Sequence, residues 1–155
     1  MPRQYTCKTE NVTVSAAQDL ISITGASGKI CRIKRISVGA TNTTTPTNQE
    51  IRLRCRYLPA TVTAGSGGSS ITPAKLDQGD AAATFTSRGN DTTPATTSGT
   101  AVVLWAQGVN ILAGLDYSFE DMPTVNVSTA FVFELLSTVS GTVALSAEVD
   151  VEEIG

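Results

Sequence analysis

The side chains best suited to acid–base chemistry lie in one short segment, where Asp116, Glu120 and Asp121 form a tight cluster of acids. Two carboxylates held about 5–10 Å apart across a cleft can hydrolyse a glycosidic bond. Sugar-binding clefts usually add stacking aromatic rings, whereas the single Trp105 lies in an apolar run where core packing is expected. The chain also has no histidine, which excludes the usual Ser-His-Asp, Cys-His and zinc-hydrolase sites. We therefore expect no enzyme.

Two groups of residues resemble ligand sites, one for phosphate and one for calcium. The segment 25–29, Gly-Ala-Ser-Gly-Lys, superficially resembles a phosphate-binding loop, but Ile23 and Ile30 stand where that motif needs glycine and Ser/Thr. The segment is predicted to be a plain hairpin turn. Asp77 with Asp80, or Asp91 with Asn90, offers oxygen ligands for calcium. Turns use the same residues, so neither a metal nor another cofactor is predicted.

The three cysteines, Cys7, Cys31 and Cys55, are predicted to be reduced and buried. Their number is odd, no CxxC pair is present, and residues 1–5 contain no apolar segment typical of a secretion signal.

No run approaches the roughly 18 apolar residues that span a bilayer. We expect a protein made and kept in a cytoplasm until it reaches its destination, without a membrane partner.

Charge is divided unevenly along the chain. Residues 1–60 hold nine Lys/Arg and three Asp/Glu, whereas residues 61–155 hold two Lys/Arg and eleven Asp/Glu. Two strand-like segments, 50–57 and 143–152, alternate so that one face is apolar and the other charged. The charged faces carry Arg52, Arg54 and Arg56 in the first segment and Glu148, Asp150 and Glu152 in the second.

These two ladders predict contacts, and three alternatives stay open. The ladders pair across adjacent strands of one chain, they pair between copies, or the basic faces meet an acidic protein. A nucleic-acid partner is not expected, because the basic residues lack interleaved aromatics and the whole chain is acidic. The candidate interface residues are Arg32, Lys34, Arg35, Arg52, Arg54, Arg56, Glu148, Asp150 and Glu152.

The element pattern predicts an all-β domain over residues 1–155. Apolar and β-branched residues recur near period two in short segments bounded by turn residues, and no 3.6-residue stripe extends over ten residues. The expected strands are 4–8, 11–15, 19–24, 29–40, 50–58, 101–109, 111–119, 125–136 and 142–152.

Residues 59–100 differ from the rest because they are rich in Ala, Thr, Ser, Gly, Asn and Pro. We expect a long polar loop excursion that packs on the domain or reaches a neighbour. Within it, 72–77 is predicted to form a single helical turn, with Thr as N-cap and Pro at the first position. A short strand is expected at 84–86.

Two stretches carry a family resemblance. Residues 72–83, Thr-Pro-Ala-Lys-Leu-Asp-Gln-Gly-Asp-Ala-Ala-Ala after a Gly/Ser-rich loop, resemble a segment of small structural proteins of tailed phages. The C-terminal part, 130–135 and 140–155, is similar to the ending of the same group. The resemblance implies the virion-associated jelly-roll proteins, many of which are head decoration (cement) proteins. These commonly sit as trimers on the outer capsid lattice and clamp capsid subunits.

Together these observations predict a jelly-roll-like antiparallel β-sandwich with one long polar loop excursion. The expected function is that of a capsid decoration protein, a homotrimer that binds the major capsid protein on the outside of the virion. The alternatives are a phage tail, neck or fibre component, and a carbohydrate-binding module with a jelly-roll fold. No family residue is carried over by position, because shape defines that family more than motif does.

Overall fold

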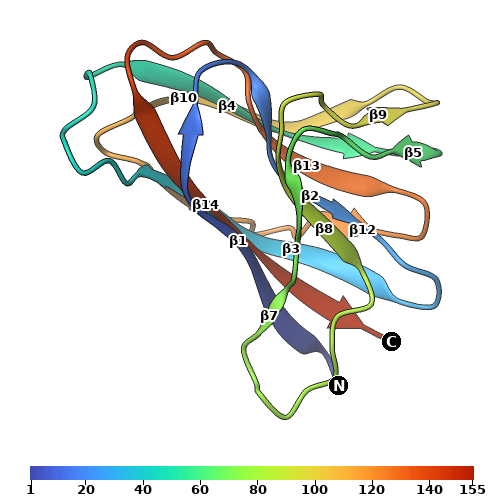
Figure 1. The fold of residues 1–155 in the computed structure, drawn as a ribbon. Helices are drawn as coiled ribbons and strands as arrows, with labels where there is room; N and C mark the ends of the chain where they lie inside the picture. The colour runs from blue at the N-terminus through green and yellow to red at the C-terminus, as the bar shows by residue number, and fades with distance from the viewer.

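Alternating apolar and polar residues build two antiparallel sheets that pack face to face, and the computed structural model describes all 155 residues (Figure 1). The first sheet, called sheet A, has six strands. Its order is β11 (Leu115–Ser118), β3 (Ile30–Ala40), β14 (Val143–Ile154), β1 (Arg3–Val14) and β7 (Ala74–Lys75), with β12 (Thr124–Val125) also paired to β3.

The second sheet, called sheet B, also has six strands. Its order is β10 (Val102–Asn110), β4 (Glu50–Leu58), β13 (Ala130–Leu135), β2 (Gln18–Thr24), β8 (Thr86–Asp91) and β6 (Ser69–Ile71). A two-stranded ribbon joins β5 (Val62–Thr63) to β9 (Thr96–Thr97). The predicted all-β sandwich is therefore confirmed.

The core lies between the inner faces of sheets A and B and is mostly aliphatic. Its largest fully buried side chains include Tyr5, Phe131 and Phe133. A series of aromatic rings leads from this core to the surface at one side of the sandwich. Phe131 contacts Phe119, Phe119 contacts Tyr117, and Tyr117 contacts Trp105, with ring centroids 6.1, 5.1 and 5.5 Å apart. These rings fill the gap between β10 and β11, the edge strands of the two sheets.

The excursion 59–100 contains five short strands and covers the sandwich in three places. β8 and β6 extend sheet B beyond β2, and β7 extends sheet A beyond β1. A second apolar cluster of Leu58, Ala95, Ala130 and Val132 lies apart from the main core, with Val62 packed against it. The excursion thus supplies sheet edges and packs Ala95 and Val62 against apolar residues of sheet B, beyond the polar loop that was predicted.

Five local predictions were wrong, and tertiary pairing explains three of them. The strand expected at 125–136 is two strands, because β12 pairs with β3 in sheet A whereas β13 belongs to sheet B. The helical turn at 72–77 is absent, because Ala74 and Lys75 pair with the open edge of β1. The segment 25–29 is not a hairpin turn, since β2 and β3 belong to different sheets. The other two involve segment boundaries. The strands expected at 4–8 and 11–15 are one strand with an irregularity, and the segment 111–119 forms a strand only at its end.

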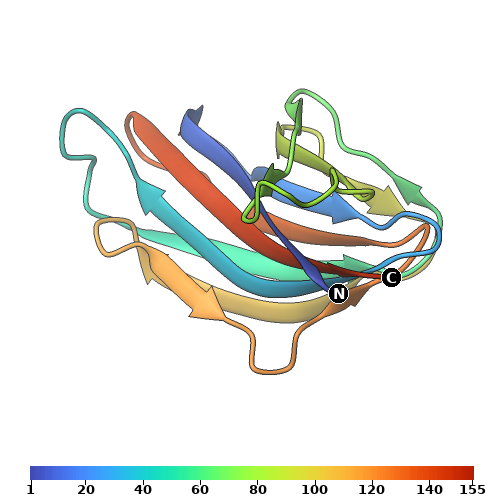
Figure 2. The ribbon, with the colours of Figure 1, turned by 90° about the horizontal axis from the view of Figure 1, so that it is seen from below.

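The remaining surface features are loops. Figure 2 shows the segment 119–123, between β11 and β12, projecting from the sandwich. Glu120 and Asp121 lie in this segment and are exposed. The structure contains no helix with the length and apolar composition that crossing a membrane requires.

Candidate interaction surfaces

The outer face of sheet A brings together charged residues from three strands. Arg35 on β3 lies opposite Asp150 on β14 in the strand register. Its guanidinium donates to Glu148 at 2.6 Å, to Asp150 at 3.1 Å, and to both oxygens of Asp116 at 2.7 and 3.1 Å. These hydrogen bonds raise the pKa of Arg35, and the Arg35 guanidinium lowers the pKa of Asp116. Arg35 is therefore the centre of this face.

The rest of this face is also paired. Arg32 lies 3.8 Å from Glu152, and Glu152 accepts a hydrogen bond of 2.8 Å from Gln4. Lys34 donates to the other amide atom of Gln4 at 3.0 Å. The partners are partly exposed, so each pair contributes at most about 1 kcal/mol to stability. The network leaves the face with few unpaired charges.

Of the three alternatives, the structure excludes the pairing of the arginine ladder of β4 with the acid ladder of β14 within one chain. β4 belongs to sheet B and β14 to sheet A, so the two charged faces point away from each other on opposite sides of the core. The acids pair with β3 instead, and two of the arginines pair with an acid that the sequence analysis did not single out.

That acid is Glu134, which is only 4% exposed on the outer face of sheet B. It sits at an irregularity in the pairing of β13 with β2, next to Asp19. The Nε atoms of Arg54 and Arg56 donate to its two carboxylate oxygens, the second at 3.0 Å. Each arginine supplies a charge-assisted hydrogen bond, which a buried carboxylate needs to remain ionised.

Asp19 extends this cluster toward the excursion. One of its oxygens accepts a 2.7 Å hydrogen bond from the Ala95 N–H, and the other lies 3.9 Å from Arg56 without a hydrogen bond. Arg56 in turn donates to the Ala95 carbonyl at 3.1 Å. The pKa of Asp19 is raised to about 6, chiefly by burial and also by the neighbouring Glu134 charge, against the opposing effects of the Ala95 hydrogen bond and of Arg56.

Two more buried carboxylates accept hydrogen bonds from the excursion, Asp91 from within it and Glu153 from β14 of the sandwich. Asp91, a candidate calcium ligand, binds Arg88 through two hydrogen bonds of 2.9 and 2.7 Å and accepts a third from the Gly68 N–H. Glu153 accepts hydrogen bonds from the N–H and hydroxyl of Thr84 at 2.9 and 2.5 Å. Three carboxylates, with Asp19, thus accept backbone hydrogen bonds from the polar segment 59–100.

Arg52 differs from its two neighbours on β4. Its side chain is exposed and forms no ion pair, whereas its backbone N–H donates to the Ser137 hydroxyl. Of the nine candidate interface residues, Arg52 is the arginine most available to a partner. Arg54 and Arg56 are committed to Glu134.

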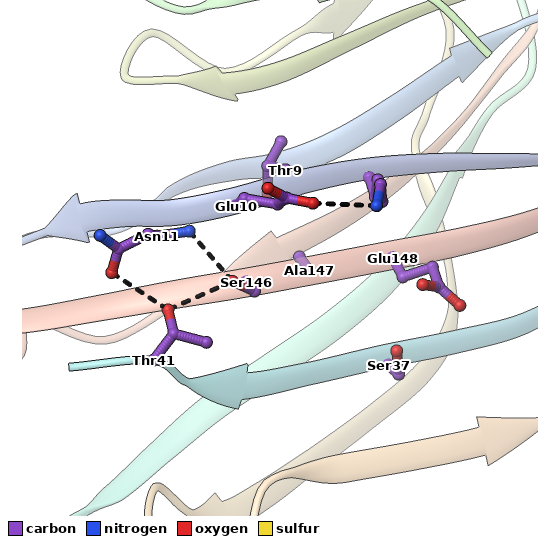
Figure 3. A pocket seen from close by; sticks show the side chains of 9 residues that line it. Thr9, Glu10, Asn11, Ser37, Thr41, Ser146, Ala147 and Glu148 are labelled. Atoms are coloured by element: carbon purple, nitrogen blue, oxygen red, sulfur yellow. Dashed lines mark hydrogen bonds and ion pairs between the residues drawn. The ribbon is translucent and has the colours of Figure 1, made fainter. Parts of the chain in front are cut away.

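A polar groove of about 450 Å³ crosses the outer face of sheet A between β1, β14 and β3 (Figure 3). At one end Asn11 donates its N–H to Ser146, and the Thr41 hydroxyl contacts both residues. At the other end Lys8 and Glu10 form an ion pair of 2.9 Å. Its polar groups largely bond one another, so the groove is a hydrated part of the charged face.

The acid cluster of the sequence analysis does not form a cleft. Asp116 is bound by Arg35, whereas Glu120 and Asp121 lie on the projecting loop. No group of three or more His, Cys, Asp or Glu side chains is placed to hold a metal ion.

The structure bears on the predictions for the three cysteines and for Trp105. All three cysteines are free and buried, as expected, and burial raises the pKa of Cys7 and of Cys31 to about 12. Trp105 packs against the core but stays partly exposed beside Tyr117. The expected core packing of Trp105 is therefore confirmed, while part of its side chain remains at the surface.

Comparison with known proteins gives no relative, because no family model, curated protein or solved structure matches the chain. The functional inference therefore depends on the surfaces described above.

The Glu134 cluster predicts unequal roles for two arginines on the same strand. Arg56→Met should lower the free energy of unfolding by about 3 kcal/mol, because it removes one partner of a buried charge. The matched control Arg52→Met should change it by less than about 0.5 kcal/mol, since Arg52 is exposed and unpaired. Urea denaturation measures both, and equal losses would contradict the proposed role of Glu134.

The Asp19 environment predicts a specific pH dependence. Because its folded-state pKa of about 6 lies above the ordinary value of 3.8, the folded state binds the proton more tightly. Its contribution to stability is therefore complete below pH 3.8 and is lost as pH rises through 6, by about 3 kcal/mol in total. Asp19→Asn should remove this fall, measured by urea denaturation across the range. An unchanged profile in Asp19→Asn, with the exposed Asp121→Asn as control, would refute the assignment.

Proposed function

We propose that the protein is a structural component of a virus particle, specifically a decoration (cement) protein on the outer capsid surface. In this proposal it forms a homotrimer, binds the major capsid protein and stabilises the head. The single observation that carries the proposal is the strand order of the sandwich. That order supports the jelly-roll interpretation, and the sequence resemblance links the jelly roll to this class of virion protein.

The strand order is that of eight strands wound between two sheets. In chain order, β1, β3, β11 and β14 fall in sheet A, and β2, β4, β10 and β13 fall in sheet B. They form the four-strand sets β11-β3-β14-β1 and β10-β4-β13-β2. Such a double-sheet arrangement of two Greek keys is typical of jelly rolls in viral capsid and lectin domains.

The construction of the sandwich supports a mechanical role. β14 pairs along its length with β3 on one side and β1 on the other, so both terminal strands lie within sheet A. The buried carboxylates of Glu153 and Asp19 hold the excursion on the sandwich at Thr84 and Ala95. A body tied in this way has few segments that can yield, which suits a protein that bridges capsid subunits under internal pressure.

The charged faces supply orientation more than affinity. Complementary charge across an interface steers association and fixes register, while buried apolar area supplies most of the binding free energy. Arg52 is our choice for the capsid contact on sheet B, because it has no ion-pair partner. On sheet A the candidate contacts are Arg32, Lys34 and the acids Glu148, Asp150 and Glu152, through the outward parts of their side chains.

The proposal predicts that the protein sediments with phage heads in many copies per particle. Quantitative mass spectrometry of heads and tails separated on a gradient measures this. Arg52→Ser should lower the number of bound copies at raised salt, whereas changing all three arginines would also unpair Glu134. Association with tails in a few copies would support a tail, neck or fibre role instead, and a protein that remains in the soluble fraction would refute the virion role.

One observation favours carbohydrate binding as a second candidate. Tyr117 is 36% exposed and its ring lies 5.5 Å from that of Trp105, so two aromatic rings meet the surface together. Aromatic faces of this kind can stack on sugar rings.

A decoration protein predicts no change in Trp105 fluorescence on titration with soluble glycans. A glycan-binding module predicts a saturable change that Tyr117→Ala removes. Since Trp105 is the only tryptophan, the signal reports this surface without interference.

A further inference from the structure

The four outer edges of the two sheets are not protected equally. β6, β7 and β11 have three, two and four residues, and a very short edge strand offers little template for pairing. β10 has nine residues and ends sheet B with one side unpaired. It is the longest of the four strands that end the sheets.

The composition of β10 does not prevent another strand from pairing with this edge. The strand Val102–Asn110 contains no Lys, Arg, Asp, Glu or Pro, the residues that usually prevent one strand edge from pairing with another. A single irregularity between Val103 and Trp105 is its one protecting device. The six residues from Trp105 to Asn110 pair with β4 in continuous register, and up to Val109 no other strand pairs with their outer side.

β10 also exposes an apolar segment at its beginning. Val102, Val103 and Leu104 are 49%, 53% and 42% exposed, although they belong to a strand. Tyr117 and Trp105 continue this surface around the side of the sandwich. Neighbouring apolar side chains of this size on an unpaired edge indicate an interaction site.

We propose that β10 pairs antiparallel with β10 of a second copy of the chain across a two-fold axis, so that sheet B continues from one copy into the other. Two identical antiparallel strands supply each other's hydrogen-bond donors and acceptors. This contact is additional to the proposed trimer, because its symmetry is two-fold. In a capsid lattice it would link one trimer to the next.

Charge favours a second copy as the occupant. A two-fold contact places a patch against itself, so any charge in it meets a like charge. β10 has no charge, and the nearest unpaired arginine, Arg52, lies opposite Gly108 toward one end of the strand. In an antiparallel pair the two copies of Arg52 lie toward opposite ends. Arg54, opposite Ala106 near the centre, is already neutralised by Glu134.

Sedimentation tests the proposal with a matched pair of variants. Val103→Glu introduces a charge on β10, and Val127→Glu introduces the same charge at an equally exposed valine (53%) outside any strand. We expect Val103→Glu to raise the dissociation constant of the two-fold contact by at least about tenfold, which corresponds to ~1.4 kcal/mol. Val127→Glu should leave it unchanged. Equal effects, or no concentration-dependent association of the wild type, would overturn the proposal.

Single-cysteine variants along β10 identify the symmetry. In a two-fold antiparallel pair, a cysteine near the axis meets its own copy and forms a disulfide, with yield falling on both sides along the strand. The three native cysteines are buried, so they give little background. A contact with three-fold symmetry, or a strand from another protein, gives no such maximum and overturns the inference while leaving the virion role intact. Loss of head binding with the maximum preserved refutes the virion role alone.

Discussion

The organisation of this protein depends on neutralising Glu134, a carboxylate held at 4% exposure on the outer face of sheet B. An unpaired buried charge costs several kcal/mol, so β4 must place two arginines beside it. The same cluster holds Asp19, whose carboxylate binds the Ala95 N–H and so fastens the far end of the excursion. A single electrostatic requirement thus couples the sandwich to the segment that covers it. Arg54 and Arg56, two residues that look like an interface ladder, are internal counter-ions.

The pairing of charges distinguishes surfaces that stabilise the fold from surfaces that are available to partners. On sheet A, Arg35 forms ion pairs with three carboxylates, so most of the exposed charges are already paired within the chain. What remains without a partner is the side of the molecule where β10 and β11 meet, with its apolar strand and aromatic rings. Arg52 lies on the strand next to this edge. The exposed groups without a partner in the chain therefore lie mainly on one side of the molecule.

Sequence periodicity predicted the strands well because strand faces are set by local alternation, which is visible in one segment at a time. The excursion and the charge pairs were harder, because they depend on which strands become neighbours. Nothing local shows that Glu134 lies beside Asp19, or that β4 and β14 occupy different sheets. The polar interruption at each of these two acids, within otherwise apolar strands, was the available signal. The β7 pairing overrode a helix-start signal at Thr72 and Pro73 because β1 offered an open edge.

The pairing of β1 with β14 has a consequence for synthesis. Arg3 lies opposite Glu153. Because β1 is made before β14, its main hydrogen-bonded partner does not yet exist when β1 is synthesised. Pairing between such distant segments is slow, since the chain between them must first be brought together. Until β14 has been made, the long β1 strand has no partner for most of its backbone groups. Sheet A is therefore completed late in synthesis, and a partly made chain with an unpaired β1 is exposed to aggregation.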